Sequence, residues 1–199
     1  MSQYQYSPLS QSPDSLDRIR LLRLLPANTE ARHEEAEIRC ELFEYPLQSS
    51  NSSTHLYEAL SYVWGSPENR RSIRVNGSEL LVTENLYAAL LHLRNAYLAR
   101  VIWIDAICID QENHHEKKRQ IQLMSKIYGL AQRVVVWLGE ATDMSDVAMG
   151  GIRMIAEQRS PNLENFEVMQ GLIISLLRRP WFERIWVSCP GVCCGLAEC

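Results

Sequence analysis

The stretch that decides the fold is residues 101–116, VIWIDAICIDQENHHE. Its first four residues form an apolar run typical of a buried β-strand, and a helical pattern begins near His114. In α/β proteins, ligands bind just beyond the carboxyl ends of the strands. The stretch therefore indicates an α/β fold with its candidate site between the strand and the helix. The candidate side chains in this stretch are Asp105, Cys108, Asp110 and Gln111.

The segments around this strand extend it into a parallel sheet. A helical pattern covers residues 114–130, and an apolar run at 134–138 follows it. A strand, a helix and a second strand within about 38 residues form a crossover, which makes the two strands parallel. A further strand is predicted at 57–63, and Asn76-Gly77 predicts a tight hairpin turn within residues 73–82.

The remaining elements complete the predicted architecture. Apolar runs at 19–25 and 38–43 are expected to pair at an edge of the sheet. The sequence thus predicts a parallel sheet flanked by helices, with an added β-hairpin and N-terminal edge strands. Further helices are expected at 83–98, 144–158 and 163–177, and a last short strand near 181–187.

The composition argues against several classes of function. The chain has 199 residues, a formal net charge of −4 and scattered Lys and Arg residues, so no surface for nucleic acid is expected. No apolar run reaches the roughly 18–20 residues of a membrane span, and the N-terminus lacks a secretory pattern. We therefore expect a cytoplasmic protein without a membrane span.

One folded domain with a tail at each end is expected. Residues 1–15 are rich in Ser, Gln, Pro and Tyr, which predicts a disordered leader before a domain over residues 16–187. Residues 188–199 are an atypical tail that holds four of the six cysteines. The spacing of these cysteines lacks the repeated pair of a structural zinc site, so no metal site is predicted.

Three predicted strands end in loops that carry unusual residues. If these strands are parallel neighbours, their carboxyl ends lie on one rim of the sheet, and a shared pocket is predicted there. Besides the side chains named above, the candidates for this pocket are Tyr62, Trp64, Gly65 and Gly139.

Lys117 and Cys108 each allow two interpretations. A helical wheel places Lys117 within the apolar stripe of the helix at 114–130, where it requires an anionic partner such as Asp105 or Asp110. Alternatively, Lys117 only covers the core with its aliphatic part and fixes local geometry. Cys108 has no neighbouring His to activate it, so a buried, inert thiol is favoured over a nucleophile.

Several motifs follow one another over a motif core at residues 57–139. They are Tyr57-Glu-Ala-Leu-Ser-Tyr-Val-Trp-Gly65, Ile73-x-Val-Asn-Gly77, Thr83-x-Asn-Leu86, Trp103-Ile-Asp-Ala-Ile-Cys-Ile-Asp-Gln111, Glu116-Lys-x-x-Gln-Ile121 and Val136-Trp-Leu-Gly139, with a weaker match at Arg179-Pro-Trp-Phe-x-Arg-x-Trp186. Together these motifs resemble the fungal heterokaryon incompatibility (HET) domain. The resemblance implies a module that mediates nonself recognition after hyphal fusion and triggers programmed cell death, by assembly or by binding a protein partner.

The HET domain is also similar to Toll/interleukin-1 receptor (TIR) domains, which are flavodoxin-like α/β folds that oligomerise in signalling. Some TIR domains cleave NAD at its nicotinamide bond. The resemblance therefore implies a flavodoxin/TIR-like sheet, and an NAD glycohydrolase as an alternative function with NAD as its substrate. Glu116 is then the candidate catalytic carboxylate, which would stabilise an oxocarbenium-like centre at the ribose.

The sequence departs from the family pattern in two places. Asp110 and Lys117 stand where the family usually has Asn and Arg, so a guanidinium fork becomes a point charge. The family's Gln-Glu pair, whose Glu aligns with the TIR catalytic carboxylate, does not follow Trp186-Val187. The domain is thus expected to be truncated at its C-terminal end, and an inactive fragment is the third interpretation.

Overall fold

A computed structural model describes residues 2–10, 17–27, 37–47, 55–157 and 166–183. This part of the chain falls into two compact units, one that ends at Trp137 and one that begins at Leu138. The predicted domain over 16–187 overlaps both units, and the described residues 2–10 belong to the first unit. The predicted tail at 188–199 lies outside the described residues.

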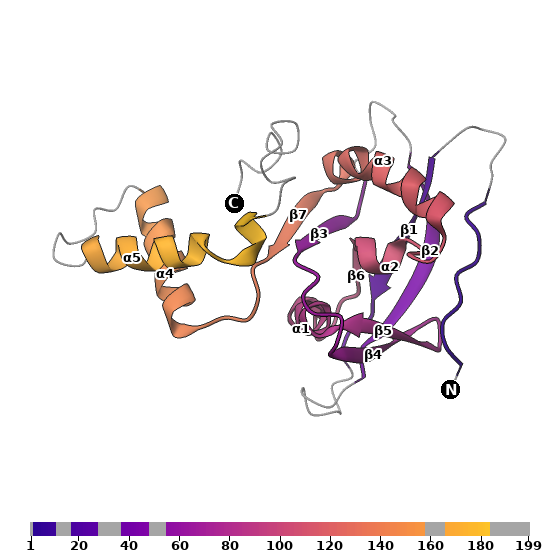
Figure 1. The fold of residues 1–199 in the computed structure, drawn as a ribbon, viewed down its shortest axis with the longest axis horizontal. Coiled ribbons are helices and arrows are strands. Elements are labelled where there is room, and N and C mark those ends of the chain that lie inside the picture. Colours follow the sequence, from indigo (N-terminus) through magenta and orange to yellow (C-terminus); the bar gives the residue numbers. More distant parts are fainter. Residues whose placement is uncertain (1, 11–16, 28–36, 48–54, 158–165, 184–199) are drawn as a thin grey trace. The chain divides into compact units, whose positions relative to one another are not determined.

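The first unit is built on a seven-stranded mixed sheet with the strand order β5-β4-β2-β1-β6-β3-β7 (Figure 1). The predicted α/β class is confirmed, and the three strands β6, β3 and β7 are parallel neighbours. The strands are β1 (Asp17–Leu24), β2 (Arg39–Leu47), β3 (Glu58–Tyr62), β4 (Arg70–Val75), β5 (Ser78–Thr83), β6 (Arg100–Trp103) and β7 (Arg133–Trp137). The helices of this unit are α1 (Glu84–Leu93), α2 (Asp105–Cys108) and α3 (His114–Leu130).

The order in which the chain visits the parallel strands reverses direction across the sheet. The chain runs from β3 through α1 to β6 on one side, and then through α3 back past β3 to β7 on the other side. This is the strand order with which a flavodoxin-like sheet begins. Because such crossovers are right-handed, α1 and α3 cover opposite faces of the sheet. Figure 1 draws β3 and β6 between these two helices.

The N-terminal strands differ from the prediction, because they lie inside the sheet rather than at its edge. They pair with each other as expected, in antiparallel fashion, but β1 lies between β2 and β6. The physical reason is that β1 carries apolar residues on both faces: Ile19 and Leu21 alternate with Leu22 and Leu24, and all four are buried. A strand of this kind requires cover on both faces and a neighbour on each side.

The outer position in the sheet belongs to the hairpin of β4 and β5, which confirms the predicted turn. Asn76 and Gly77 have φ angles of 50° and 82°, as a type I′ turn requires. The Asn76 side chain also continues the pairing of β4 with β2. Its Oδ1 accepts the Leu42 N–H and its Nδ2 donates to the Leu42 carbonyl, each at 3.0 Å.

Residues 2–10, which we call the strap, belong to the segment predicted as a disordered leader, and the structure places them against the sheet. Gln3 forms an isolated parallel bridge with Glu79 at the outer edge of β5. Tyr4 and Tyr6 pack against the core with their rings edge-to-face, 5.0 Å apart. The two tyrosines, on alternate residues, supply apolar contacts that the overall composition of the segment, rich in Ser and Gln, did not predict.

Two predicted elements end differently in the structure. Helix α1 stops at Leu93 rather than near residue 98, because Asn95 Oδ1 accepts the N–H groups of Tyr97 and Leu98 and forms a turn. Where a strand was predicted near 181–187, a 3₁₀ helix, η2 (Pro180–Glu183), occupies the first of these residues. The rest of that prediction lies outside the described residues.

The second unit contains the two predicted helices, α4 (Asp143–Ala156) and α5 (Phe166–Leu177). They pack closely at Gly151, where an added Cβ would come within 2.5 Å of the Met169 sulfur. Thr142 and Ser145 form a capping box at the start of α4. In the part of the chain that the structure describes, no helix has the length and apolarity needed to cross a membrane.

Asn76→Ala is expected to lower the free energy of unfolding by about 2 kcal/mol. The variant loses both hydrogen bonds to Leu42, and each contributes roughly 1 kcal/mol net. Urea unfolding measures the change. Asn69→Ala is the matched control, since the Asn69 side chain is exposed and forms no hydrogen bond to another described residue. Equal stability of the two variants would contradict the prediction.

Candidate functional site

Trp64 and Asp105 lie together at the carboxyl edge of the parallel strands. Trp64 follows β3 and Asp105 follows β6, and the Trp64 indole Nε1–H donates to Asp105 Oδ2 at 3.0 Å. Asp105 is only 7% exposed, whereas Trp64 is 41% exposed. The carboxylate therefore fixes one edge of an indole ring that is partly exposed to solvent.

Asp105 is held by further hydrogen bonds within its own loop. Its second oxygen, Oδ1, accepts the Ala106 N–H at 2.8 Å, and its backbone carbonyl accepts the Gln111 side-chain amide at 2.8 Å. Both oxygens of this carboxylate are thus engaged. Gln111, a predicted site residue, contributes by holding the loop.

Asn85 spans the topological switch point between β3 and β7, and the sequence analysis did not select it as a site residue. Its Nδ2 donates to the Val63 carbonyl at 2.5 Å, and its Oδ1 accepts the Trp137 indole N–H at 2.9 Å. Gly65 approaches it closely: the φ angle of Gly65 is 76°, and an added Cβ would meet the Asn85 Cβ at 3.3 Å. The Thr83-x-Asn85 motif was the available signal for this role.

A buried ion pair lies behind the Asp105 loop. Arg20 of β1 donates through Nη1 to Glu116 Oε1 at 2.5 Å and through Nη2 to Oε2 at 2.9 Å. Arg20 is 4% exposed and Glu116 is 9% exposed. Glu116 Oε1 also accepts the Asp110 N–H at 2.9 Å. Arg20 was missed by the sequence analysis, although a basic residue within an apolar strand is a signal of such a pair.

The other Arg20 contacts join two further segments to this ion pair. Nη1 donates to the Cys108 carbonyl at 3.2 Å, and Nη2 donates to the Ser7 carbonyl in the strap at 2.7 Å. The Tyr6 ring lies 5.1 Å from the guanidinium carbon, within cation–π range. One side chain therefore connects the strap, β1, α2 and α3.

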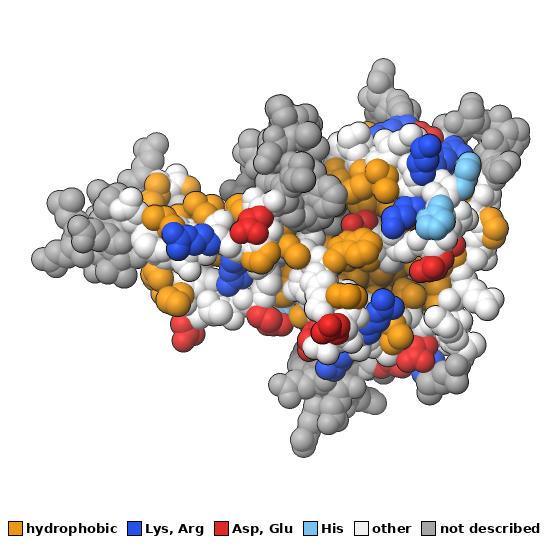
Figure 2. Space-filling view, in the orientation of Figure 1, with side chains coloured by type: hydrophobic (Ala, Val, Ile, Leu, Met, Phe, Trp, Pro, Cys, Tyr) orange, Lys and Arg blue, Asp and Glu red, His pale blue; other side chains and the backbone are white. Residues whose placement is uncertain are grey.

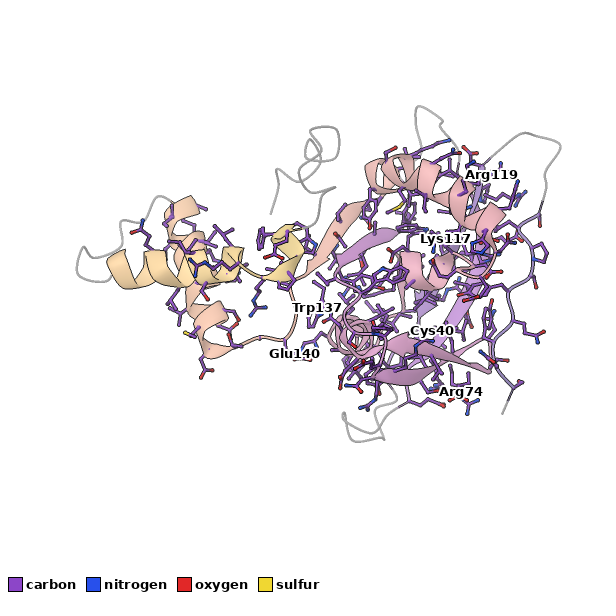
Figure 3. The ribbon with its side chains drawn as sticks, viewed as in Figure 1. Cys40, Arg74, Lys117, Arg119, Trp137 and Glu140 are labelled. Carbon is purple, nitrogen blue, oxygen red and sulfur yellow. The ribbon has the colours of Figure 1, made fainter. Side chains whose placement is uncertain are left out.

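The inward position on α3 was predicted for Lys117, and the structure assigns it to other residues. Helix α3 buries Glu116, Gln120 and Ile127, so its inner face lies about one residue away from the predicted stripe. Lys117 is half-buried, and among the described residues it forms no ion pair with Asp105 or Asp110. Figure 3 shows Lys117 on this helix. The charge that enters the interior comes from β1 instead.

Cys108 is buried within α2, and burial raises the pKa of its thiol to about 12. Its sulfur accepts the Ile104 N–H at 3.3 Å. A thiol of this kind remains protonated at neutral pH and is a poor nucleophile. The geometry therefore fits the inert interpretation of Cys108.

Two further candidates take separate places. Tyr62 is almost completely buried and belongs to the core of the first unit. Gly139 belongs to the second unit, where its φ angle is 99° and Arg179 donates to the neighbouring carbonyls of Leu138 and Glu140. Across the described residues, no group of three or more His, Cys, Asp and Glu side chains is placed to share a metal ion.

Comparisons of the sequence with known proteins identify a family. The sequence model of the family described as "Heterokaryon incompatibility protein (HET)" matches residues 57–188. The chain is 33% identical over 168 residues to "Heterokaryon incompatibility protein 6, OR allele" of Neurospora crassa. The aligned region covers 78% of this chain and 23% of that relative. No solved structure matches.

The chain belongs to the heterokaryon incompatibility (HET) family. It spans less than a quarter of the length of the Neurospora relative. The matched region contains the Trp64–Asp105 pair, Asn85 and Glu116, while Arg20 and the strap precede it.

Glu116→Gln is expected to lower the free energy of unfolding by about 3–5 kcal/mol. The substitution leaves the buried Arg20 guanidinium without a counter-charge, which is costly in the interior. Denaturant unfolding measures this loss. Glu112→Gln is the matched control, because Glu112 is exposed in the loop that precedes α3. A Glu116→Gln chain as stable as the control would contradict the prediction.

Cys108 is expected to react with iodoacetamide only after unfolding, as measured by peptide mass spectrometry. The raised pKa also predicts a pH dependence. The unfolded thiol ionises near its ordinary value of 9.0, while the folded thiol does so only at about 12. The free energy of unfolding should therefore decrease as the pH rises from 9 toward 12. Modification of Cys108 in the native chain at pH 8 would refute its burial.

Proposed function

We propose that this chain acts in fungal vegetative incompatibility as a protein-binding module. In this proposal it assembles with a protein partner or with further copies of itself in the cytoplasm after hyphal fusion, and so contributes to nonself recognition and programmed cell death. Family membership supports the biological setting. The geometry of the Trp64 edge supports the mode of action.

The engagement of the acidic side chains is the observation that carries this proposal. Glu116, the candidate catalytic carboxylate, has both oxygens bound to Arg20 and is buried. Asp105 also has both oxygens bound, to Trp64 and to the Ala106 N–H. A carboxylate that acts on a substrate must come within hydrogen-bond reach of the reacting group, and these two carboxylates are buried and bound to neighbouring donors. Here both groups support the loop instead.

The exposed indole of Trp64 has the character of an interface anchor. Interfaces concentrate their binding energy on aromatic and Arg side chains, and a ring that is already fixed loses little entropy on binding. Trp64 is fixed at its Nε1 by Asp105 while a large part of its surface is exposed. Figure 2 shows acidic and basic side chains interspersed on the face drawn, with apolar side chains between them. Such a surface suits a protein partner better than a polyanion.

An NAD glycohydrolase of the TIR type remains the second candidate, because one observation favours it. The order β6-β3-β7 is that of a flavodoxin-like sheet, and an aromatic ring lies beside a carboxylate near the switch point, where nucleotides bind in such folds. In this alternative, Glu116 would have to leave Arg20 before it could stabilise the ribose. The third alternative is an inactive fragment, and an experiment must distinguish it from the other two.

The test is induced expression in a filamentous fungus, with hyphal death measured by uptake of a vital dye. Trp64→Ala is expected to reduce cell death at least tenfold at equal protein level, since a truncated hot-spot residue costs over about 1.4 kcal/mol. Leu56→Ala is the matched control: Leu56 is an exposed apolar residue just before the amino end of β3.

The same proteins, purified, are incubated with NAD, and free nicotinamide is measured. Cell death that requires Trp64, without release of nicotinamide, supports the proposal. Nicotinamide release that Glu116→Gln abolishes in a chain shown by circular dichroism to remain folded would support the enzyme instead. The absence of both cell death and nicotinamide release would support the inactive fragment.

A further inference from the structure

Helix α2 is a single turn, Asp105–Cys108, and its first residue is the Asp105 of the Trp64–Asp105 pair. A helix this short cannot satisfy its last carbonyl groups internally, so these require partners from elsewhere. The Tyr6 hydroxyl donates to the Ile107 carbonyl at 2.9 Å, and Arg20 donates to the Cys108 carbonyl at 3.2 Å.

The strap that carries Tyr6 is fixed on both sides of this residue. Toward the amino terminus, the Tyr4 N–H donates to the Glu79 carbonyl at 2.7 Å, and the Glu79 N–H donates to the Ser2 carbonyl at 3.0 Å. Toward the carboxyl terminus, the Ser7 carbonyl accepts Arg20 Nη2 at 2.7 Å. Tyr6 is therefore held at a defined position above α2 and Arg20.

We propose that Tyr6 is a positioning residue for the Trp64–Asp105 pair. Its hydroxyl, presented by the bound strap, holds the carboxyl end of α2, and α2 holds Asp105 where its carboxylate accepts the Trp64 indole N–H. Displacement of the strap releases α2 and loosens the fixed edge of the indole. The proposal rests on the proposed function only in taking Trp64 as the docking residue.

Three links in series carry this inference. The strap reaches Ile107 through Tyr6, Ile107 and Asp105 belong to the same helical turn, and Asp105 reaches Trp64. Arg20 reinforces the connection because it binds both the strap and the last carbonyl of α2. The strap is far from Trp64 in the sequence, so its effect on Trp64 passes through this short helix.

Tyr4 provides the matched control. Like Tyr6 it lies on the strap, is half-buried and packs against the core, and the two rings are in contact. Unlike Tyr6, its hydroxyl has no hydrogen-bond partner among the described residues. Tyr6→Phe and Tyr4→Phe therefore remove the same atom from neighbouring rings, and only the first substitution removes a bond to α2.

The experiment follows the indole N–H resonances of the full chain labelled with ¹⁵N-tryptophan, with the Trp64 signal assigned from Trp64→Phe. Tyr6→Phe is expected to shift the Trp64 signal. Measured separately by mass spectrometry, hydrogen exchange of the amides at 104–111 is expected to accelerate roughly fivefold, which corresponds to one lost hydrogen bond. Tyr4→Phe is expected to leave both measurements unchanged.

Three results would overturn the proposal. These are an unchanged Trp64 signal in a folded Tyr6→Phe chain, an equal effect of Tyr4→Phe, and a Tyr6→Phe chain that does not fold, since one hydroxyl would then support the whole fold. Neither measurement involves a partner protein. A Tyr6 effect without any hyphal cell death would therefore refute the proposed function and leave the positioning role intact.

Discussion

The buried pair of Arg20 and Glu116 is the interaction on which the rest of the first unit depends. A guanidinium and a carboxylate are costly to remove from water, and the cost is offset only when geometry is good and the remaining donors find partners. Here the two groups meet through two parallel hydrogen bonds, and the other Arg20 bonds go to backbone carbonyls of α2 and the strap. Arg20 thus holds α2, α3 and the strap in place, and these three segments in turn supply the hydrogen-bond partners that Arg20 requires.

Local patterns in the sequence were sufficient to predict the parallel strands. The crossover through α3 follows from an apolar run, a helical stripe and a second apolar run, and the hairpin follows from Asn76-Gly77. From these elements it was possible to predict that the ends of β3 and β6 share one rim. The hydrogen bond between Trp64 and Asp105 places the two residues together there.

The features that the sequence did not predict depend on contacts between segments far apart in the chain. Arg20 and Glu116 are separated by 96 positions and Tyr6 and Ile107 by 101, and no periodicity links such residues. The buried face of α3 was predicted one residue away from its actual position for the same reason. A helical wheel assigns the charged Glu116 to the outer face, because it does not include the partner Arg20. Asn85 was passed over because amide groups are common in the first turn of a helix, where they ordinarily cap it.

The hydrogen bonds between Ser2, Tyr4 and Glu79 have a further consequence for the outer edge of the sheet. An uncovered edge strand offers a row of amide and carbonyl groups on which strands of neighbouring molecules can add, and this is a common route to aggregation. The strap occupies part of that row at β5 with the chain's own backbone. The same few residues that reach α2 thus also leave fewer free backbone groups at this edge for strands of neighbouring molecules to pair with.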